Sequence, residues 1–315
     1  MTGTPNSITL RHRDSGIAAR FLAHGCTLVE LSRGEQSFLA TLSCDSAYPG
    51  NAAFAGTVIG RVANRIAGGR FEVEGTRYAT PQNDGPNTLH GGPCGFHMKA
   101  WNIRKIGADE AVFTYVSPDG EMGFPGRLHA QIRARVGASG LTLDYEAITT
   151  AATPVSLTHH PYFRLPGATG ADDMALRTAA DSFSATGPDD IPTRYASSVT
   201  DTPFDFREAR IVGATTIDHS FNSGGSGLRP VAELLSKRAR LSVASTLPAV
   251  QVYTGDALDT VGLERRAGLA IEPQYPPNWV NAGEEARRAL PHIGPVILQP
   301  GETYRHTTAY RLDLA

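Results

Sequence analysis

The polar side chains best suited to bind a ligand in the first hundred residues lie in two short segments, 60–66 and 87–92. Asn64 offers both a hydrogen-bond donor and an acceptor, Arg65 a rigid fork of donors, and His90 a ring that can take either role. The glycines that follow His90 permit backbone conformations closed to other residues and allow a ligand to approach closely. This mixture suits a polyhydroxylated ligand, whose hydroxyls each donate and accept hydrogen bonds. The alternative is that these are ordinary surface and loop residues.

A second polar cluster, THHPYF at 158–163, places two histidines side by side after an apolar stretch. Because neighbouring residues of a strand point to opposite faces, His159 and His160 are not expected to serve one site. We expect His159 to be the structural histidine of the two. The segment has neither HxH nor HxxxH spacing and no carboxylate at ligand spacing, so no metal site is predicted.

A third cluster lies late in the chain, where Glu272 ends an apolar strand. Burial at such a position would partly desolvate the carboxylate and raise its pKa. A lone glutamate at a strand end is also commonly a surface residue or the partner of an arginine. Two further polar positions lie between the second and third clusters: Asp218 in the segment DHSF (218–221), and Gln251 in a strand-like segment.

Strand-like alternation dominates the segments that must position these residues. Residues 128–136 alternate apolar and polar side chains, and residues 70–78 have the pattern of a hairpin. Helical periodicity is confined to residues 284–290, and residues 186–194, which contain two prolines, are predicted to form a loop. No repeat or composition break marks a boundary. The sequence therefore predicts one domain over residues 1–315, all-β, built as a large antiparallel β-sandwich with very little helix.

Composition excludes several classes of function. The chain has 315 residues, 41% hydrophobic and 19% charged, and a formal net charge of −2, which favours neither nucleic acid nor an anionic membrane. Cys26, Cys44 and Cys94 show no CxxC spacing, so neither a disulfide framework nor a zinc site is predicted. No basic region followed by an apolar run opens the sequence, and no apolar run approaches about 18 residues. We therefore expect a cytoplasmic protein without a membrane span.

Seven segments, in chain order, resemble those of the aldose 1-epimerase (galactose mutarotase) family. They are GRVANRI (60–66), NTLHGG (87–92), HPYF (160–163), DHSF (218–221), QVYTG (251–255), EPQ (272–274) and LQPGETY (298–304). One such match is weak, whereas seven in order over almost the whole chain are specific. The resemblance implies the galactose mutarotase-like form of the β-sandwich, known as a supersandwich.

The resemblance also implies an isomerase that interconverts the α and β anomers of a free aldose. By similarity, Glu272 is the general base that takes the proton from the C1 hydroxyl, and His160 is the acid that protonates the ring oxygen. The side chains implied to hold the sugar hydroxyls are Arg65, His90, Asp218, Gln251 and Asn64. No group leaves and no redox change occurs in this reaction, so neither a metal nor an organic cofactor is required.

The sequence departs from the family pattern near two motifs. Arg164 and Trp279 stand where the family has smaller or differently polar residues, and both are candidates for contacts that change which sugar fits. The preferred monosaccharide, a hexose or a pentose, is therefore left open, as is the acceptance of sugar phosphates. A monomer or a weak homodimer is expected.

Two other classes of function compete with the epimerase. The first is a non-catalytic sugar-binding or sugar-sensing protein on the same scaffold, since a fold does not fix a function. Such a protein would not need both Glu272 and His160. The second is a glycoside hydrolase or lyase. Glycosidases usually need two carboxylates flanking the scissile bond, and Asp218 would have to be the second.

Overall fold

The computed structural model describes residues 6–315, and its regular structure is almost entirely antiparallel β-strand. Among these residues the only α-helix is α1 (Glu284–Ala289), which falls in the one segment where helical periodicity was expected. No helix in the described part of the chain is long and apolar enough to cross a membrane. The prediction of an all-β fold with very little helix is confirmed.

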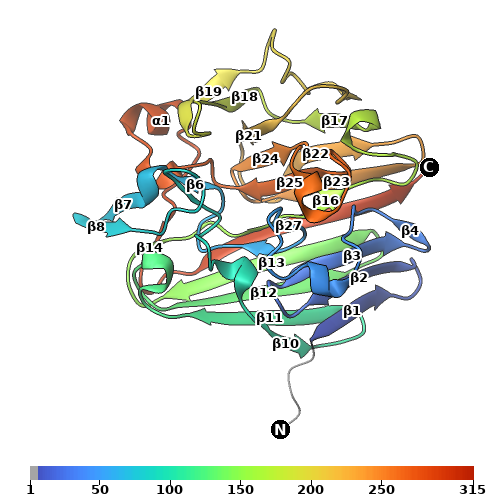
Figure 1. Cartoon of the computed structure of the whole chain (residues 1–315), viewed down its shortest axis with the longest axis horizontal. Helices are drawn as coiled ribbons and strands as arrows, with labels where there is room; N and C mark the ends of the chain where they lie inside the picture. The colour runs from blue at the N-terminus through green and yellow to red at the C-terminus, as the bar shows by residue number, and fades with distance from the viewer. Residues whose placement is uncertain (1–5) are drawn as a thin grey trace.

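The largest sheet has nine strands and runs across the molecule (Figure 1). In spatial order they are β10 (Asn102–Lys105), β11 (Glu110–Ser117), β12 (Leu128–Val136), β13 (Gly140–Thr149), β27 (Tyr304–Leu314), β23 (Ala239–Ser245), β22 (Arg229–Leu235), β17 (Ala175–Thr178) and β20 (Arg210–Ile211). Along β12 every second residue, from Leu128 to Val136, is buried. This period of two, visible in the sequence, turns one face of the sheet toward the core.

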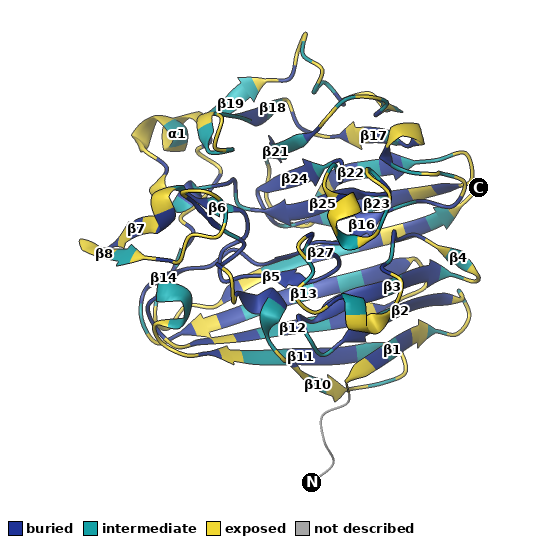
Figure 2. Ribbon diagram, viewed as in Figure 1, coloured by how far each residue is buried: buried dark blue, intermediate teal, exposed yellow. Residues whose placement is uncertain are grey.

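A six-stranded sheet packs against the first one and carries the residues of the third cluster. Its strands, in spatial order, are β16 (Tyr162–Phe163), β25 (Leu269–Gln274), β24 (Ala249–Tyr253), β21 (Asp218–Asn222), β18 (Ser182–Thr186) and β19 (Pro192–Ser198). All six residues of β25 are buried, and β24 and β25 are mostly dark blue in Figure 2. Leu269 and Ile271 join the main hydrophobic core on one face. The opposite face of β25 is therefore also covered, although it carries Glu272.

The remaining strands form smaller sheets around these two. A four-stranded sheet contains β1 (Ser7–His12), β2 (Ile17–Leu22), β3 (Thr27–Arg33) and β4 (Gln36–Ser37). The two-stranded pairs are β5 (Val58–Ile59) with β15 (Thr158–His159), β6 (Arg65–Ile66) with β9 (Thr88–Leu89), β7 (Arg70–Val73) with β8 (Thr76–Ala79), and β14 (Thr153–Pro154) with β26 (Ile297–Leu298). The hairpin predicted over 70–78 is confirmed as β7 and β8, which project from the left of the molecule in Figure 1.

The loop predicted over residues 186–194 is shorter in the structure at both ends. Only residues 187–191 connect β18 to β19, while Thr186 and Pro192 pair with each other across the two strands. Pro192 is tolerated because it begins β19, the outermost strand of its sheet, where its missing N–H leaves no ladder bond unmade. The segment therefore forms the tight tip of a hairpin.

Candidate active site

A small polar cavity contains every side chain that the sequence analysis proposed for the site. Its volume is about 170 Å³, well below the roughly 300–1,000 Å³ usual for pockets that take drug-sized ligands. The lining includes all seven predicted residues, namely Asn64, Arg65, His90, His160, Asp218, Gln251 and Glu272. The fold thus gathers the three sequence clusters and both isolated polar positions around one space of the size that suits a single small molecule.

Three strands of the six-stranded sheet present Asp218, Gln251 and Glu272 on one face. Gln251 of β24 lies directly opposite Glu272 of β25 on one side and Ser220 of β21 on the other. Asp218 precedes Ser220 by two residues and so shares its face. The alternate residues, such as Ile271, point into the hydrophobic core. Strand register and alternation together therefore place the two carboxylates and the amide on the cavity side.

Asn64, Arg65 and His90 come from the short pair β6 and β9 and the residues beside it. Asn64 and His90 have positive φ angles of 62° and 53° and are joined by two hydrogen bonds. The His90 N–H donates to the Asn64 carbonyl at 3.1 Å, and the Asn64 N–H donates to Nδ1 of His90 at 3.1 Å. At Gly91, where φ is 82°, a Cβ would lie 2.1 Å from the carbonyl oxygen of Gly60. The glycine is therefore required for this close backbone approach.

The adjacent histidines are separated as strand geometry predicts. His159 is fully buried, with Nδ1 3.0 Å from the Tyr145 hydroxyl and Nε2 3.0 Å from the Cys26 carbonyl oxygen. His160 lies in the cavity wall, and its ring centroid is 5.4 Å from that of His90. His159 is thus a structural histidine with both nitrogens bonded, whereas His160 is positioned to contact a ligand.

His160 and Glu272 form a buried pair within the cavity. Nε2 of His160 lies 3.4 Å from Oε1 of Glu272, and the two residues are only 4% and 1% exposed. Burial lowers the pKa of His160 to about 4. Burial, with a smaller contribution from the nearby Asp218, raises the pKa of Glu272 well above its usual value. Because burial disfavours the charged form of each side chain, we expect the pair to hold one proton between its two members over a wide range of pH.

Asp218 is bonded to Gln251 but not directly to Arg65. Nε2 of Gln251 donates to Oδ1 of Asp218 at 2.5 Å. Oδ2 of Asp218 lies 3.9 Å from Nη1 of Arg65, which is too far for a direct hydrogen bond. Burial raises the pKa of Asp218, although Arg65 and Gln251 act in the opposite direction. A group that both accepts and donates a hydrogen bond, such as a hydroxyl, can bridge Nη1 and Oδ2 from one side.

His90, His160 and Glu272 also converge in a way that the sequence spacing did not indicate. Their potential metal-ligand atoms all lie within 4.8 Å of one another. The hydrogen bonding of His90 disfavours a metal here, because Nδ1 accepts the N–H of Asn64 and the ring proton must then sit on Nε2. Neither nitrogen of His90 keeps a free lone pair. The ring instead presents a hydrogen-bond donor through Nε2.

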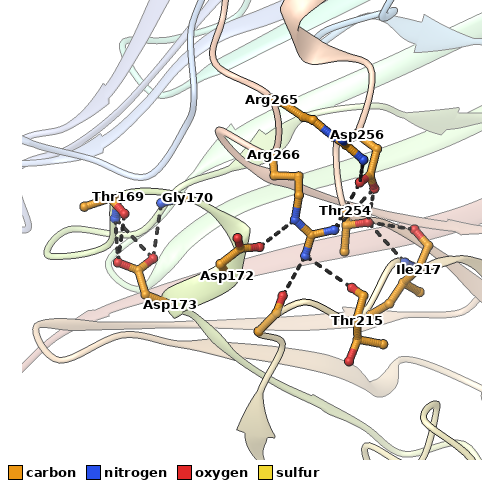
Figure 3. A network of polar contacts seen from close by, with 11 residues as sticks. Thr169, Gly170, Asp172, Asp173, Thr215, Ile217, Thr254, Asp256, Arg265 and Arg266 are labelled. Atoms are coloured by element: carbon orange, nitrogen blue, oxygen red, sulfur yellow. Dashed lines mark hydrogen bonds and ion pairs between the residues drawn. The ribbon is translucent and has the colours of Figure 1, made fainter.

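A polar network centred on Arg266 holds the segment that follows β24 (Figure 3). The guanidinium of Arg266 lies 3.2 Å from Asp256 and donates to Asp172 at 2.5 Å. Immediately after Asp256, the N–H of Ala257 donates to the hydroxyl of Tyr253 at 2.8 Å. Ala257 and Tyr253 both line the cavity. Arg266, Asp256 and Asp172 are not in the cavity lining themselves, so their contacts support the segment that carries Ala257 from outside the cavity.

Comparison with known proteins agrees with this arrangement. The model of the family described as aldose 1-epimerase matches residues 6–311. The chain belongs to the aldose 1-epimerase family. It is 34% identical to a galactose mutarotase from Bos taurus over 318 residues, which cover 93% of this chain and 90% of that protein. It is 32% identical to an aldose 1-epimerase from Escherichia coli K12 over 338 residues, which cover 98% and 96% of the two chains.

Solved structures of family members share the fold. An aldose epimerase homologue from C. elegans superposes with a TM-score of 0.88 at 24% identity, covering 99% of this chain and 100% of the other. The galactose 1-epimerase from Lactobacillus acidophilus NCFM gives a TM-score of 0.86 at 24% identity, with the same coverage. The predicted galactose mutarotase-like β-sandwich is thus confirmed. The isomerase class expected from the sequence is the class of the family.

Aromatic side chains complete the cavity and were not proposed from the sequence. The ring of Phe54 lies 4.7 Å from His90 and 6.3 Å from His160, centroid to centroid. Tyr162 and Tyr253 line the same cavity. The two tyrosines stand inside family segments, each two residues after a site residue, since Tyr162 follows His160 and Tyr253 follows Gln251. That spacing was a usable signal. Phe54 lies in an irregular segment at a positive φ of 55°, so no periodicity marked it.

The two residues proposed to change which sugar fits, Arg164 and Trp279, are both absent from the cavity lining. Asn278 adopts a φ of 56°, and this turn directs Trp279 into a separate apolar cluster. There Nε1 of Trp279 donates to the Gly294 carbonyl at 3.0 Å. Although Trp279 is close to Glu272 in the sequence, it does not line the cavity that Glu272 lines.

Proposed function

We propose that the protein interconverts the α and β anomers of a free aldose, with Glu272 as the general base and His160 as the general acid. The observation that carries this proposal is the buried pair itself, with Nε2 of His160 3.4 Å from Oε1 of Glu272 in a cavity of monosaccharide size. Membership of the aldose 1-epimerase family supports the same activity.

The proton shared by the pair accounts for the chemistry. Anomer exchange requires one proton to leave the C1 hydroxyl and another to reach the ring oxygen, and both oxygens are bonded to the same carbon. When the shared proton resides on His160, Glu272 is a carboxylate that can accept the first proton while His160 donates the second. The ring opens to the aldehyde, the C1–C2 bond rotates, and closure on the other face reverses both transfers.

The remaining polar side chains are proposed to bind the sugar hydroxyls. The Nε2–H of His90 is a donor, and Asp218 offers Oδ2 as an acceptor because its Oδ1 already receives Gln251. The side-chain oxygen of Asn64 accepts the N–H of Arg65 at 2.8 Å, which leaves its amide nitrogen for a ligand. The site therefore offers separate donors and acceptors, as recognition of a polyol requires.

The test is polarimetry on freshly dissolved α-anomers of galactose, glucose, arabinose and xylose, with and without the protein. We expect faster relaxation to the same final rotation for at least one of these sugars, and the relative rates give the preference. No acceleration of any of them, together with binding of one sugar by calorimetry, would refute the epimerase and leave a sugar-binding or sensing role.

A further inference from the structure

The guanidinium of Arg65 is surrounded by three carboxylates, two of which lie outside the cavity lining. Nε donates to Oδ2 of Asp84 at 2.7 Å, Nη2 lies 3.0 Å from Oδ2 of Asp190, and Nη1 lies 3.9 Å from Oδ2 of Asp218. The side chain of Arg65 is only 12% exposed, whereas those of Asp84 and Asp190 are 36% and 47% exposed. Two of its three nitrogens are therefore already engaged.

We propose that Asp84 and Asp190 are positioning residues that hold Arg65 with Nη1 directed at the bound sugar. This inference rests on the proposed function, because it assumes that Arg65 binds a hydroxyl of the substrate. Nε donates to Asp84 and Nη2 is ion-paired with Asp190, whereas the carboxylate recorded beside Nη1, that of Asp218, lies beyond hydrogen-bond distance. Nη1 is therefore the nitrogen proposed to bind the ligand. They act through Arg65 and do not touch the sugar themselves.

The distances explain why the flanking carboxylates matter. A hydroxyl oxygen to one side of the line joining the two side chains can accept a hydrogen bond from Nη1 of Arg65 and donate one to Oδ2 of Asp218, so it bridges the 3.9 Å separation. Without Asp84 and Asp190, the planar fork of Arg65 is free to turn and pair with Asp218 directly in two parallel hydrogen bonds. That pairing would close the space that the hydroxyl needs.

The two aspartates are themselves fixed by backbone contacts that join distant segments. Asp84 lies in a turn where the N–H of Asn87 donates to its carbonyl oxygen at 2.9 Å. Asp190 lies at the tip of the β18–β19 hairpin, where its N–H donates to the Gly187 carbonyl at 3.0 Å. The side-chain amide of Asn87 also donates to the carbonyl of Asp189 at 3.1 Å. The hairpin tip is thus tied to the segment that carries Asp84, and Arg65 lies between them.

The experiment compares Asp84→Asn and Asp190→Asn with wild type, using the sugar that wild type turns over best in polarimetry. We expect KM to rise on the order of tenfold for each variant and kcat to change less than about twofold, because ground-state binding is lost and the acid–base pair is intact. The matched control is Asp189→Asn, which removes an exposed neighbouring carboxylate on the same hairpin tip and is expected to leave KM unchanged. A KM that stays constant or falls in Asp190→Asn would overturn the proposal, since a fall would mean that the sugar displaces this carboxylate.

A double-mutant cycle separates positioning from simple stabilisation of the hairpin. In an Arg65→Gln background there is no guanidinium to orient, so Asp190→Asn is expected to change KM less than about twofold there. Equal effects in both backgrounds would overturn the proposal, because the aspartate would then act independently of Arg65. Calorimetric Kd values for the same sugar repeat the cycle without catalysis. If wild type binds the sugar but does not turn it over, the proposed epimerase activity is refuted, while the Kd values still test whether the aspartates position Arg65. If wild type neither binds nor turns over any of the four sugars, the epimerase activity and the positioning role are both refuted.

Discussion

Replacing Glu272 by glutamine removes the proposed proton acceptor while keeping the shape of the side chain. Glu272 is 1% exposed, and in the described structure its Oε2 has no hydrogen-bond partner. An amide at this position cannot accept a proton from the C1 hydroxyl. A positioned general base contributes about 10²- to 10⁴-fold in rate, or about 2.7–5.4 kcal/mol of transition-state stabilisation. We therefore expect kcat to fall by at least about 10²-fold.

The same substitution has the opposite effect on stability. Because burial raises the pKa of Glu272, the folded state already disfavours its charged form, and a neutral amide avoids that cost. The melting temperature of Glu272→Gln is thus expected to equal or exceed that of wild type. Polarimetric kcat and calorimetric melting are measured together, with the exposed Glu285→Gln on α1 as control. A folded variant that keeps kcat within about tenfold of wild type would refute the assignment of Glu272 as the base.

Three other perturbations test the same geometry. Asp218→Asn should raise KM on the order of tenfold and lower kcat less than about threefold; a collapse of kcat at constant KM would instead give Asp218 a direct role in proton transfer. The pH profile of kcat/KM should be bell-shaped. Activity should fall below about pH 4, where His160 becomes protonated while Glu272 is also protonated, and fall again above the raised pKa of Glu272, where the pair has no proton to donate. A profile without an acidic limb near pH 4 would contradict the assignment. Gly68→Ala should lower the free energy of unfolding by only ~1–2 kcal/mol, the cost of a left-handed alanine, since nothing lies near its Cβ. Gly91→Ala should lower it clearly more in chemical denaturation, because its Cβ meets the Gly60 carbonyl. Equal losses would show that the backbone around Gly91 has room for a side chain.

Much of the fold was predictable because strand formation leaves a local pattern. The alternation along 128–136 and the hairpin over 70–78 depend on side chains one or two positions apart, and both appear as expected. The same rule separated His159 from His160, since adjacent residues of a strand face opposite ways. Where irregular backbone intervenes the rule gives no guidance. Phe54 was not predicted as a cavity residue because its own positive φ redirects the chain. Trp279 was wrongly proposed as a contact for the sugar because it follows Asn278, which has a positive φ.

The sequence alone determined which residue types were available to the site: a glutamate in an apolar strand, a histidine followed by proline, and an arginine and a second histidine among glycines. Only the tertiary structure decided their geometry. The 3.4 Å between Glu272 and His160, and the enclosure of Arg65 by Asp84 and Asp190, depend on which strands pair and in what register. Such pairings join residues far apart in the chain. Local periodicity reports on chain neighbours, so it carries no information on contacts that only the closed sandwich creates.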